Sequence, residues 1–194
     1  MKNLAEAADE ATVIFRETES HRENMIRCSR SIIRETKKMI HSIHVSEDHS
    51  VNKEALCRLV AELTGYLDVG SFEKGPAEDA LAEYAEAMIL ESIVNGKEVP
   101  SFRGLGIGPG PWIMGLADCL GEIRRVVLTS LVSEDIDRAK TMFSDMEEMF
   151  HTIMMLDVPD QILPIRRKQD IARGIMERTR TDITNAIIML KVKS

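Results

Sequence analysis

Two short acidic motifs are the part of this sequence whose residue types and spacing could do chemistry. Glu83 and Glu86 are three positions apart, and Asp118 and Glu122 are four apart, so within a helix each pair lies on one face. Carboxylate oxygens are the ligands that hard cations prefer, which favours Mg²⁺ or Mn²⁺ over zinc. Such a cation can activate water and stabilise charge on a phosphoryl group. The spacing alone equally fits a solvated helix edge or an ion pair, so both interpretations stay open.

The surroundings of these motifs are mostly apolar or small. Gly115 and Gly121 flank Asp118, and we expect them to let another backbone or a ligand come close. Because unpaired carboxylates are costly to bury, we expect a cation to balance them: a metal, Arg125 on the same helical face, or both. A diiron bundle is disfavoured, since it would need two Glu-x-x-His motifs and the chain has only the one that starts at Glu148.

Basic side chains gather on one side of the first predicted helix. At about 100° per residue they occupy roughly a third of its circumference, with Met25 and Ile32 opposite. Glu35 lies well to one side, so the stripe has almost no acidic partner on its own face. Such a face can simply be solvated, but it also suits a groove that follows the phosphates of single-stranded nucleic acid. We expect His41 and His44 to lie at the helix surface. The basic stripe is Arg27, Arg30, Arg34, Lys37, Lys38 and His41.

The elements that must position these residues are all helical. Aromatic residues make up only 4% of the chain against twelve Met, and no segment alternates with the period of two that a sheet needs. Gly and Pro mark a turn at 68–76 and a long loop at 95–111. We predict an all-α antiparallel bundle of about six or seven helices, in one domain spanning residues 1–194. The predicted helices are 4–45 (with a break near 17–21 as an alternative), 51–67, 77–94, 112–131, 133–156 and 166–192.

Composition narrows the class of protein. The 194 residues are 44% hydrophobic and carry a formal net charge of -7, which argues against indiscriminate polyanion binding. Cys28, Cys57 and Cys119 form no Cys-x-x-Cys pair, so a disulfide framework or zinc knuckle is not supported. The N-terminal sequence lacks the features of a signal peptide, and no apolar run approaches the length of a membrane span. We expect a cytoplasmic protein that does not enter membranes.

Several of these segments together resemble the translin family, and within it the translin-associated factor X (TRAX) branch, in a homologue of prokaryotic or archaeal type. The resemblance covers most of the chain, and its most specific carrier is the segment around Asp118. The carriers are Arg22-Glu23, Ser29-Arg30, Glu35-Thr-Lys-Lys38, Glu83-Tyr-Ala-Glu-Ala87 and Gly115-Leu-Ala-Asp-Cys-Leu-Gly-Glu-Ile-Arg-Arg125.

The resemblance implies a seven-helix bundle that assembles into octameric shells and binds single-stranded RNA, with single-stranded DNA as a second ligand. It implies that Glu83, Glu86 and Asp118 are catalytic acids that hold Mg²⁺, that Glu122 is a further metal-side acid, and that Lys37 lies near the substrate. The leading hypothesis is therefore a metal-dependent endoribonuclease. A non-catalytic single-strand-binding shell is the alternative. An all-helical nucleotide pyrophosphatase ranks last, because its second motif resembles Glu-x-x-Asp. The Gly/Pro-rich loop departs from the family.

Overall fold

The computed structural model describes residues 3–67 and 75–193, and this part of the chain forms helices and no strand. The predicted all-α bundle is confirmed. Of the turn expected at 68–76, residues 68–74 lie outside the described residues. The six described helices are α1 (Asn3–His44), α2 (Ser50–Leu67), α3 (Gly75–Val94), α4 (Pro109–Val132), α5 (Ile136–Met154) and α6 (Arg166–Lys193).

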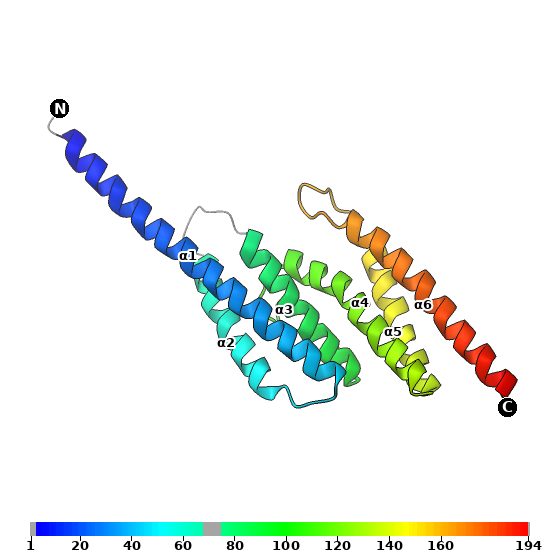
Figure 1. The fold of residues 1–194 in the computed structure, drawn as a ribbon. Coiled ribbons are helices and arrows are strands. Elements are labelled where there is room, and N and C mark those ends of the chain that lie inside the picture. The colour runs from blue at the N-terminus through cyan, green and yellow to red at the C-terminus, as the bar shows by residue number, and fades with distance from the viewer. Residues whose placement is uncertain (1–2, 68–74, 194) are drawn as a thin grey trace.

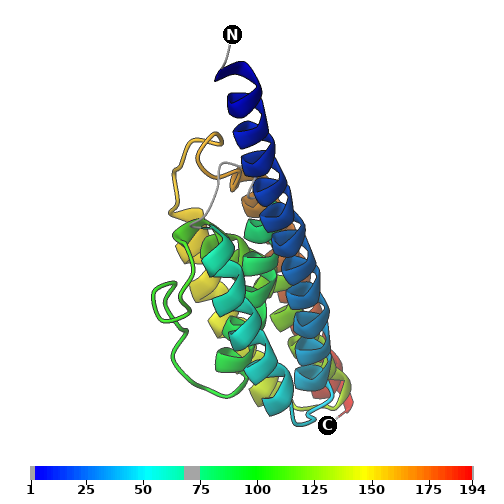
Figure 2. The same ribbon diagram turned by 90° about the vertical axis from the view of Figure 1, so that its left-hand side faces the viewer.

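Two helices, α3 and α4, form the centre of the molecule and pack against each other more extensively than any other pair. α1 packs against α3 and α2 packs mainly against α1, whereas α5 and α6 both pack against α4 (Figure 1). In the view turned by 90°, α2 and α5 lie to one side of the layer formed by α1, α3, α4 and α6 (Figure 2). The acidic motifs, which belong to α3 and α4, are therefore carried by the two helices at the centre of that layer.

The direction of the helices follows from the length of their connections. Helices joined by short connections, such as α1 and α2 or α4 and α5, run antiparallel, as expected. α3 and α4 run in the same direction, because residues 95–108 carry the chain back to the end of the bundle where α3 began (Figure 1). The indole Nε1 of Trp112 donates a hydrogen bond to the Pro100 carbonyl at 2.8 Å and ties this long connection to α4.

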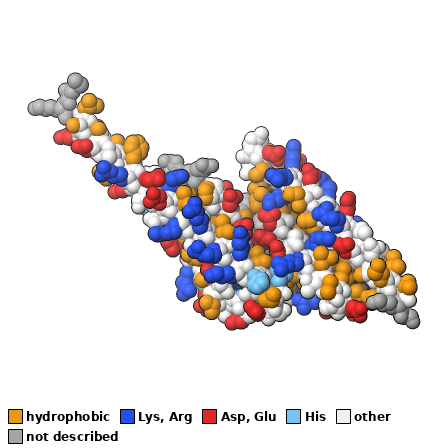
Figure 3. Space-filling model, in the orientation of Figure 1, with side chains coloured by type: hydrophobic (Ala, Val, Ile, Leu, Met, Phe, Trp, Pro, Cys, Tyr) orange, Lys and Arg blue, Asp and Glu red, His pale blue; other side chains and the backbone are white. Residues whose placement is uncertain are grey.

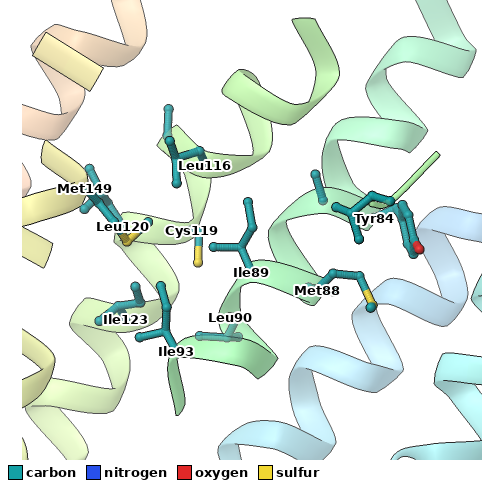
Figure 4. Close-up of a cluster of buried hydrophobic side chains, with 14 of the residues drawn as sticks. Tyr84, Met88, Ile89, Leu90, Ile93, Leu116, Cys119, Leu120, Ile123 and Met149 are labelled. Atoms are coloured by element: carbon teal, nitrogen blue, oxygen red, sulfur yellow. The ribbon is translucent and has the colours of Figure 1, made fainter. Parts of the chain in front are cut away.

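The core between the central helices is aliphatic, as the composition predicts. Figure 4 shows Ile89 and Leu90 of α3 facing Leu120 and Ile123 of α4, and all four side chains are fully buried. Burial of each such side chain contributes about 1.5–3 kcal/mol relative to leaving it exposed. α3 is buried on almost every side, which explains why it lacks a polar face.

α1 is one continuous helix, so the alternative with a break near residues 17–21 is wrong. Most helix ends differ from those expected by one to three residues, and two of these differences have a clear cause. α4 begins three residues before Trp112, because proline is tolerated in the first turn of a helix and Pro109 stands there. α5 begins at Ile136 rather than at Ser133, since Asp135 is its N-cap and accepts a hydrogen bond from the Arg138 backbone nitrogen.

The first part of α1 extends beyond the other helices (Figures 1 and 2). Val13, Ile14 and Phe15 lie there with more than half of each side chain exposed. Across residues 3–67 and 75–193, no helix combines the length and the hydropathy of a membrane span.

Candidate functional site

The acidic motifs meet where α4 crosses closest to α3, at Gly115. A Cβ atom on Gly115 would lie 2.4 Å from the Ala82 carbonyl oxygen and 2.8 Å from the Glu86 backbone nitrogen, distances that no side chain tolerates. Glycine is therefore required for this approach, as expected from the sequence. No other backbone comes close at Gly121, where a Cβ would meet nothing within 4 Å, so the expected helix approach is wrong at that position. The close approach at Gly115 places Asp118, one turn further along α4, opposite the acids of α3.

Glu83, Glu86, Asp118 and Glu122 form one electrostatic group, which we call the carboxylate cluster. Burial raises the pKa of Glu86 to about 8, and the negative charges of Asp118, Glu83 and Glu122 add to this effect. Burial also raises the pKa of Glu83, although the positive charge of Lys37 opposes the shift. The sequence-predicted acids are thus brought together, and at neutral pH they do not all carry a negative charge.

The α4 carboxylates have basic side chains as partners, from helices far away in the sequence. The Lys168 Nζ of α6 donates to Asp118 Oδ1. His44 Nε2, at the end of α1, lies 2.5 Å from Glu122 Oε2. Arg125, the partner expected from the sequence, lies at the edge with its Nη1 4.0 Å from Glu122 Oε2. Sequence reasoning missed both closer partners.

The expectation for His44 is wrong, because its side chain is only 5% exposed, whereas His41 is exposed as expected. His44 lies one turn after His41 and two turns after Lys37, so these positions share one face of α1. This spacing is a sequence signal that could have identified His44 as a neighbour of the carboxylate cluster. No comparable signal marks Lys168. Its contact depends on how α6 packs against α4, which no local spacing encodes.

The carboxylate cluster is chemically suited to a hard divalent cation. Its donors are all carboxylate oxygens, and the raised pKa of Glu86 reflects first its own burial and then the neighbouring negative charges, which Lys168 only partly opposes. Within the described residues, however, no three His, Cys, Asp or Glu side chains are already arranged around a common metal position. Asp118 and Glu122 instead face Lys168 and His44. Binding of a metal would therefore require some of these side chains to turn toward one another.

The basic stripe lies along the outer side of α1, beside the carboxylate cluster. Met25, Ile32, Met39 and Ile43 on the opposite side are buried, as expected. In Figure 3, Lys and Arg side chains follow α1, acidic side chains gather toward the middle of the same face, and further basic side chains lie on the α6 side. The members Arg27, Arg30, Arg34, Lys37, Lys38 and His41 are all exposed.

The members of the basic stripe differ in their hydrogen-bond and ion-pair partners. The expected lack of acidic partners is wrong for Lys38, whose Nζ lies 2.7 Å from Glu35 Oε1. Arg27 and Arg34 donate to neutral side chains, those of Asn24 and Ser31. Lys37 is close enough to influence the pKa of Glu83, so the stripe is continuous with the carboxylate cluster.

Comparisons with known proteins agree with this architecture. No family model matches the chain. A Methanocaldococcus jannaschii protein, the uncharacterised MJ0175, is 32% identical over 199 aligned positions that cover 100% of this chain and 90% of the relative. The structure of AfC3PO in complex with duplex RNA has a TM-score of 0.88 at 26% identity, covering 94% of this chain and 97% of that chain. C3PO structures are of the translin/TRAX type. The chain is therefore a relative of MJ0175 with the translin/C3PO fold, and the similarity to C3PO supports its place in the translin family.

Two further structures extend this result. A crystal structure of AfC3PO has a TM-score of 0.87 at 27% identity, and the match covers 94% of this chain and 98% of that chain. Apo-NeC3PO has a TM-score of 0.84 at 22% identity, with coverage of 92% and 96%, and shows the shared fold. The match spans nearly the whole chain in each case, so the helices that carry the carboxylate cluster belong to the shared fold.

Proposed function

We propose that this protein is a TRAX-like, metal-dependent endoribonuclease that cuts single-stranded or short RNA. The observation that carries the proposal is the partly buried carboxylate cluster, in which Glu86 stands beside three other acids and has a pKa of about 8. A purely structural cluster would gain nothing from a carboxyl group whose ionisation is opposed by burial and by three neighbouring acids. A divalent cation would let Glu86 ionise, because it would balance the negative charges of the cluster.

The roles of the residues follow from their positions. Glu83 and Glu86 of α3 and Asp118 and Glu122 of α4 would hold Mg²⁺ or Mn²⁺. When bound, such a cation supplies an activated water and stabilises the negative charge of a phosphoryl group. Glu86 would release its proton on metal binding, since its raised pKa keeps it largely protonated at pH 7. Lys37, beside Glu83, would hold an RNA phosphate next to the acids.

The basic stripe supports RNA as the substrate. Its exposed side chains run along α1 toward the carboxylate cluster, so a strand bound through its phosphates would be led to the acids. AfC3PO, which shares the fold, has been observed in complex with duplex RNA. Because aromatic residues are scarce, we expect phosphate contacts to dominate over base stacking, and sequence preference to be weak. Single-stranded DNA would then bind to the same stripe.

A non-catalytic RNA-binding shell is the second candidate, and one observation favours it. Lys168 and His44 already pair with the α4 acids, so two of the four carboxylates have partners without any metal. In that case the cluster would only join α1, α4 and α6, and RNA would be bound by the basic stripe without being cut.

Cleavage assays separate the two candidates. Labelled single-stranded RNA is incubated with the protein in Mg²⁺ or in EDTA, beside the Glu83→Ala and Asp118→Asn variants, with nucleoside triphosphates as a second substrate. We expect cutting that needs Mg²⁺ and is abolished in both variants. Cutting that survives EDTA and both substitutions would refute the metal site, and RNA that is bound but never cut would establish the shell. Hydrolysis of triphosphates alone would indicate a pyrophosphatase.

We also propose that the chain forms a homo-oligomer, of the octameric kind that the translin resemblance implies. The support is the part of α1 that extends beyond the other helices, where Val13, Ile14 and Phe15 are exposed. Apolar side chains grouped in this way are typical of surfaces that a partner covers. A monomer in light scattering at micromolar concentration would contradict the assembly.

A further inference from the structure

Lys168 connects α6 to the carboxylate cluster. Its Nζ donates to Asp118 Oδ1, and its side chain is 27% exposed. Its positive charge also reaches Glu83 and Glu86, where it opposes the rise in pKa. One lysine thus interacts with three of the four acids and can still be reached by a ligand from solvent.

The backbone at Lys168 is held firmly, whereas its side chain is free to change partners. The amide Nε2 of the neighbouring Gln169 donates to the carbonyl oxygens of Ile153 at 3.0 Å and Leu156 at 2.9 Å, and Ile165 is buried. The start of α6 is therefore fixed to the end of α5. A lysine ammonium is a point charge on a flexible stem, so it can change partners without any movement of the helix.

We propose that Lys168 is an exchangeable cation, which balances Asp118 in the metal-free protein and moves to a phosphate oxygen of the RNA when a divalent cation takes over that carboxylate. The proposal rests on the proposed function, in which the cluster holds a metal. A metal ion on Asp118 would repel the Lys168 ammonium, because both are positively charged. Metal binding therefore weakens the ion pair between Asp118 and Lys168. An RNA phosphate arriving at the cluster offers a replacement anion at the same place.

A structural tie between α4 and α6 is the competing role for Lys168, and the chain contains a matched control for it. Arg124 joins the same two helices, with Nη2 2.8 Å from Asp182 Oδ2 and Nη1 donating to Thr179 Oγ1 at 2.8 Å. Arg124 is not among the charges that shift the pKa of Glu83 or Glu86. Arg124→Met therefore removes an α4–α6 tie while leaving the carboxylate cluster intact.

The test compares the full-length protein with Lys168→Met and Arg124→Met in two binding measurements. Mn²⁺ affinity is measured by electron paramagnetic resonance without RNA. Affinity for a phosphorothioate RNA that resists cutting is then measured in Mn²⁺ and in EDTA. We expect Lys168→Met to bind Mn²⁺ about tenfold more tightly, because the metal no longer competes with the ammonium. In Mn²⁺ it should bind the RNA about tenfold more weakly than the unaltered protein, and in EDTA equally well.

Each outcome decides a different point. Arg124→Met should match the unaltered protein in both measurements; if it matches Lys168→Met instead, the role is structural and the proposal fails. Unchanged or weaker Mn²⁺ binding by Lys168→Met refutes the exchange, and an RNA affinity that falls equally in EDTA refutes the move to phosphate.

If the unaltered protein binds no Mn²⁺, the metal site of the proposed function fails and the exchange fails with it. Neither measurement depends on cleavage, so a protein that binds metal but never cuts RNA still tests Lys168.

Discussion

Replacing Glu86 with glutamine should stabilise the metal-free protein, and the gain should grow as the pH rises. Glutamine has nearly the same shape as the protonated acid but cannot ionise. Burial and three neighbouring acids raise the pKa of Glu86 from 4.5 to about 8 in the folded chain. Between these two values the folded state holds a proton that the unfolded state has released, so the free energy of unfolding falls as the pH rises through that window.

The size of the effect follows from the shift. One pKa unit corresponds to about 1.4 kcal/mol, so the raised pKa lowers the free energy of unfolding by on the order of 4 kcal/mol at pH 8 and by about 1 kcal/mol at pH 5. For a chain of this length, each kcal/mol changes the melting temperature by about 2–4 °C. Glu86→Gln should therefore melt roughly 8–16 °C above the unaltered protein at pH 8, and only a few degrees above it at pH 5.

The measurement is thermal unfolding in EDTA at several pH values between 5 and 8, at one protein concentration. Glu54→Gln, on the exposed side of α2, is the matched control and should follow the unaltered protein throughout. The reasoning is refuted if Glu86→Gln is no more stable at pH 8, or if its gain is the same at pH 5 as at pH 8. Either result would mean that Glu86 is already balanced in the metal-free fold.

Three further predictions concern the site and its surroundings. Gly115→Ala should force α3 and α4 apart, lower the free energy of unfolding by about 2–4 kcal/mol and abolish metal binding, whereas Gly121→Ala should be neutral or stabilise the helix slightly in the same unfolding assay. Replacing Arg30 and Arg34 with Gln should weaken RNA binding and lower its salt dependence by about one unit for each phosphate that is no longer neutralised, without changing Mn²⁺ affinity; an unchanged salt slope would exclude the basic stripe from the interface. Phe15→Glu should reduce the molecular mass measured by light scattering, and an unchanged mass would show that this end of α1 does not hold the assembly together.

Local spacing determined much of this protein. The apolar periodicity and the Gly/Pro-rich connections predicted each described helix, because helix formation and termination depend on neighbouring residues. The three- and four-residue intervals placed Glu83 beside Glu86 and Asp118 beside Glu122, since positions on one helix have a fixed geometry. The same rule predicted the exposed basic face of α1 and its buried opposite side.

Only the tertiary structure decided how these faces meet. The connection 95–108 turns α4 parallel to α3. Gly115 brings the two helices close enough for the acids of α4 to raise the pKa of Glu86 on α3. Lys168 and His44 reach those acids from α6 and α1, at distances in sequence that no helical period can encode. Spacing fixes which side chains share a face of one helix, but contacts between helices depend on connection length and on close packing, which emerge only when the whole chain is folded.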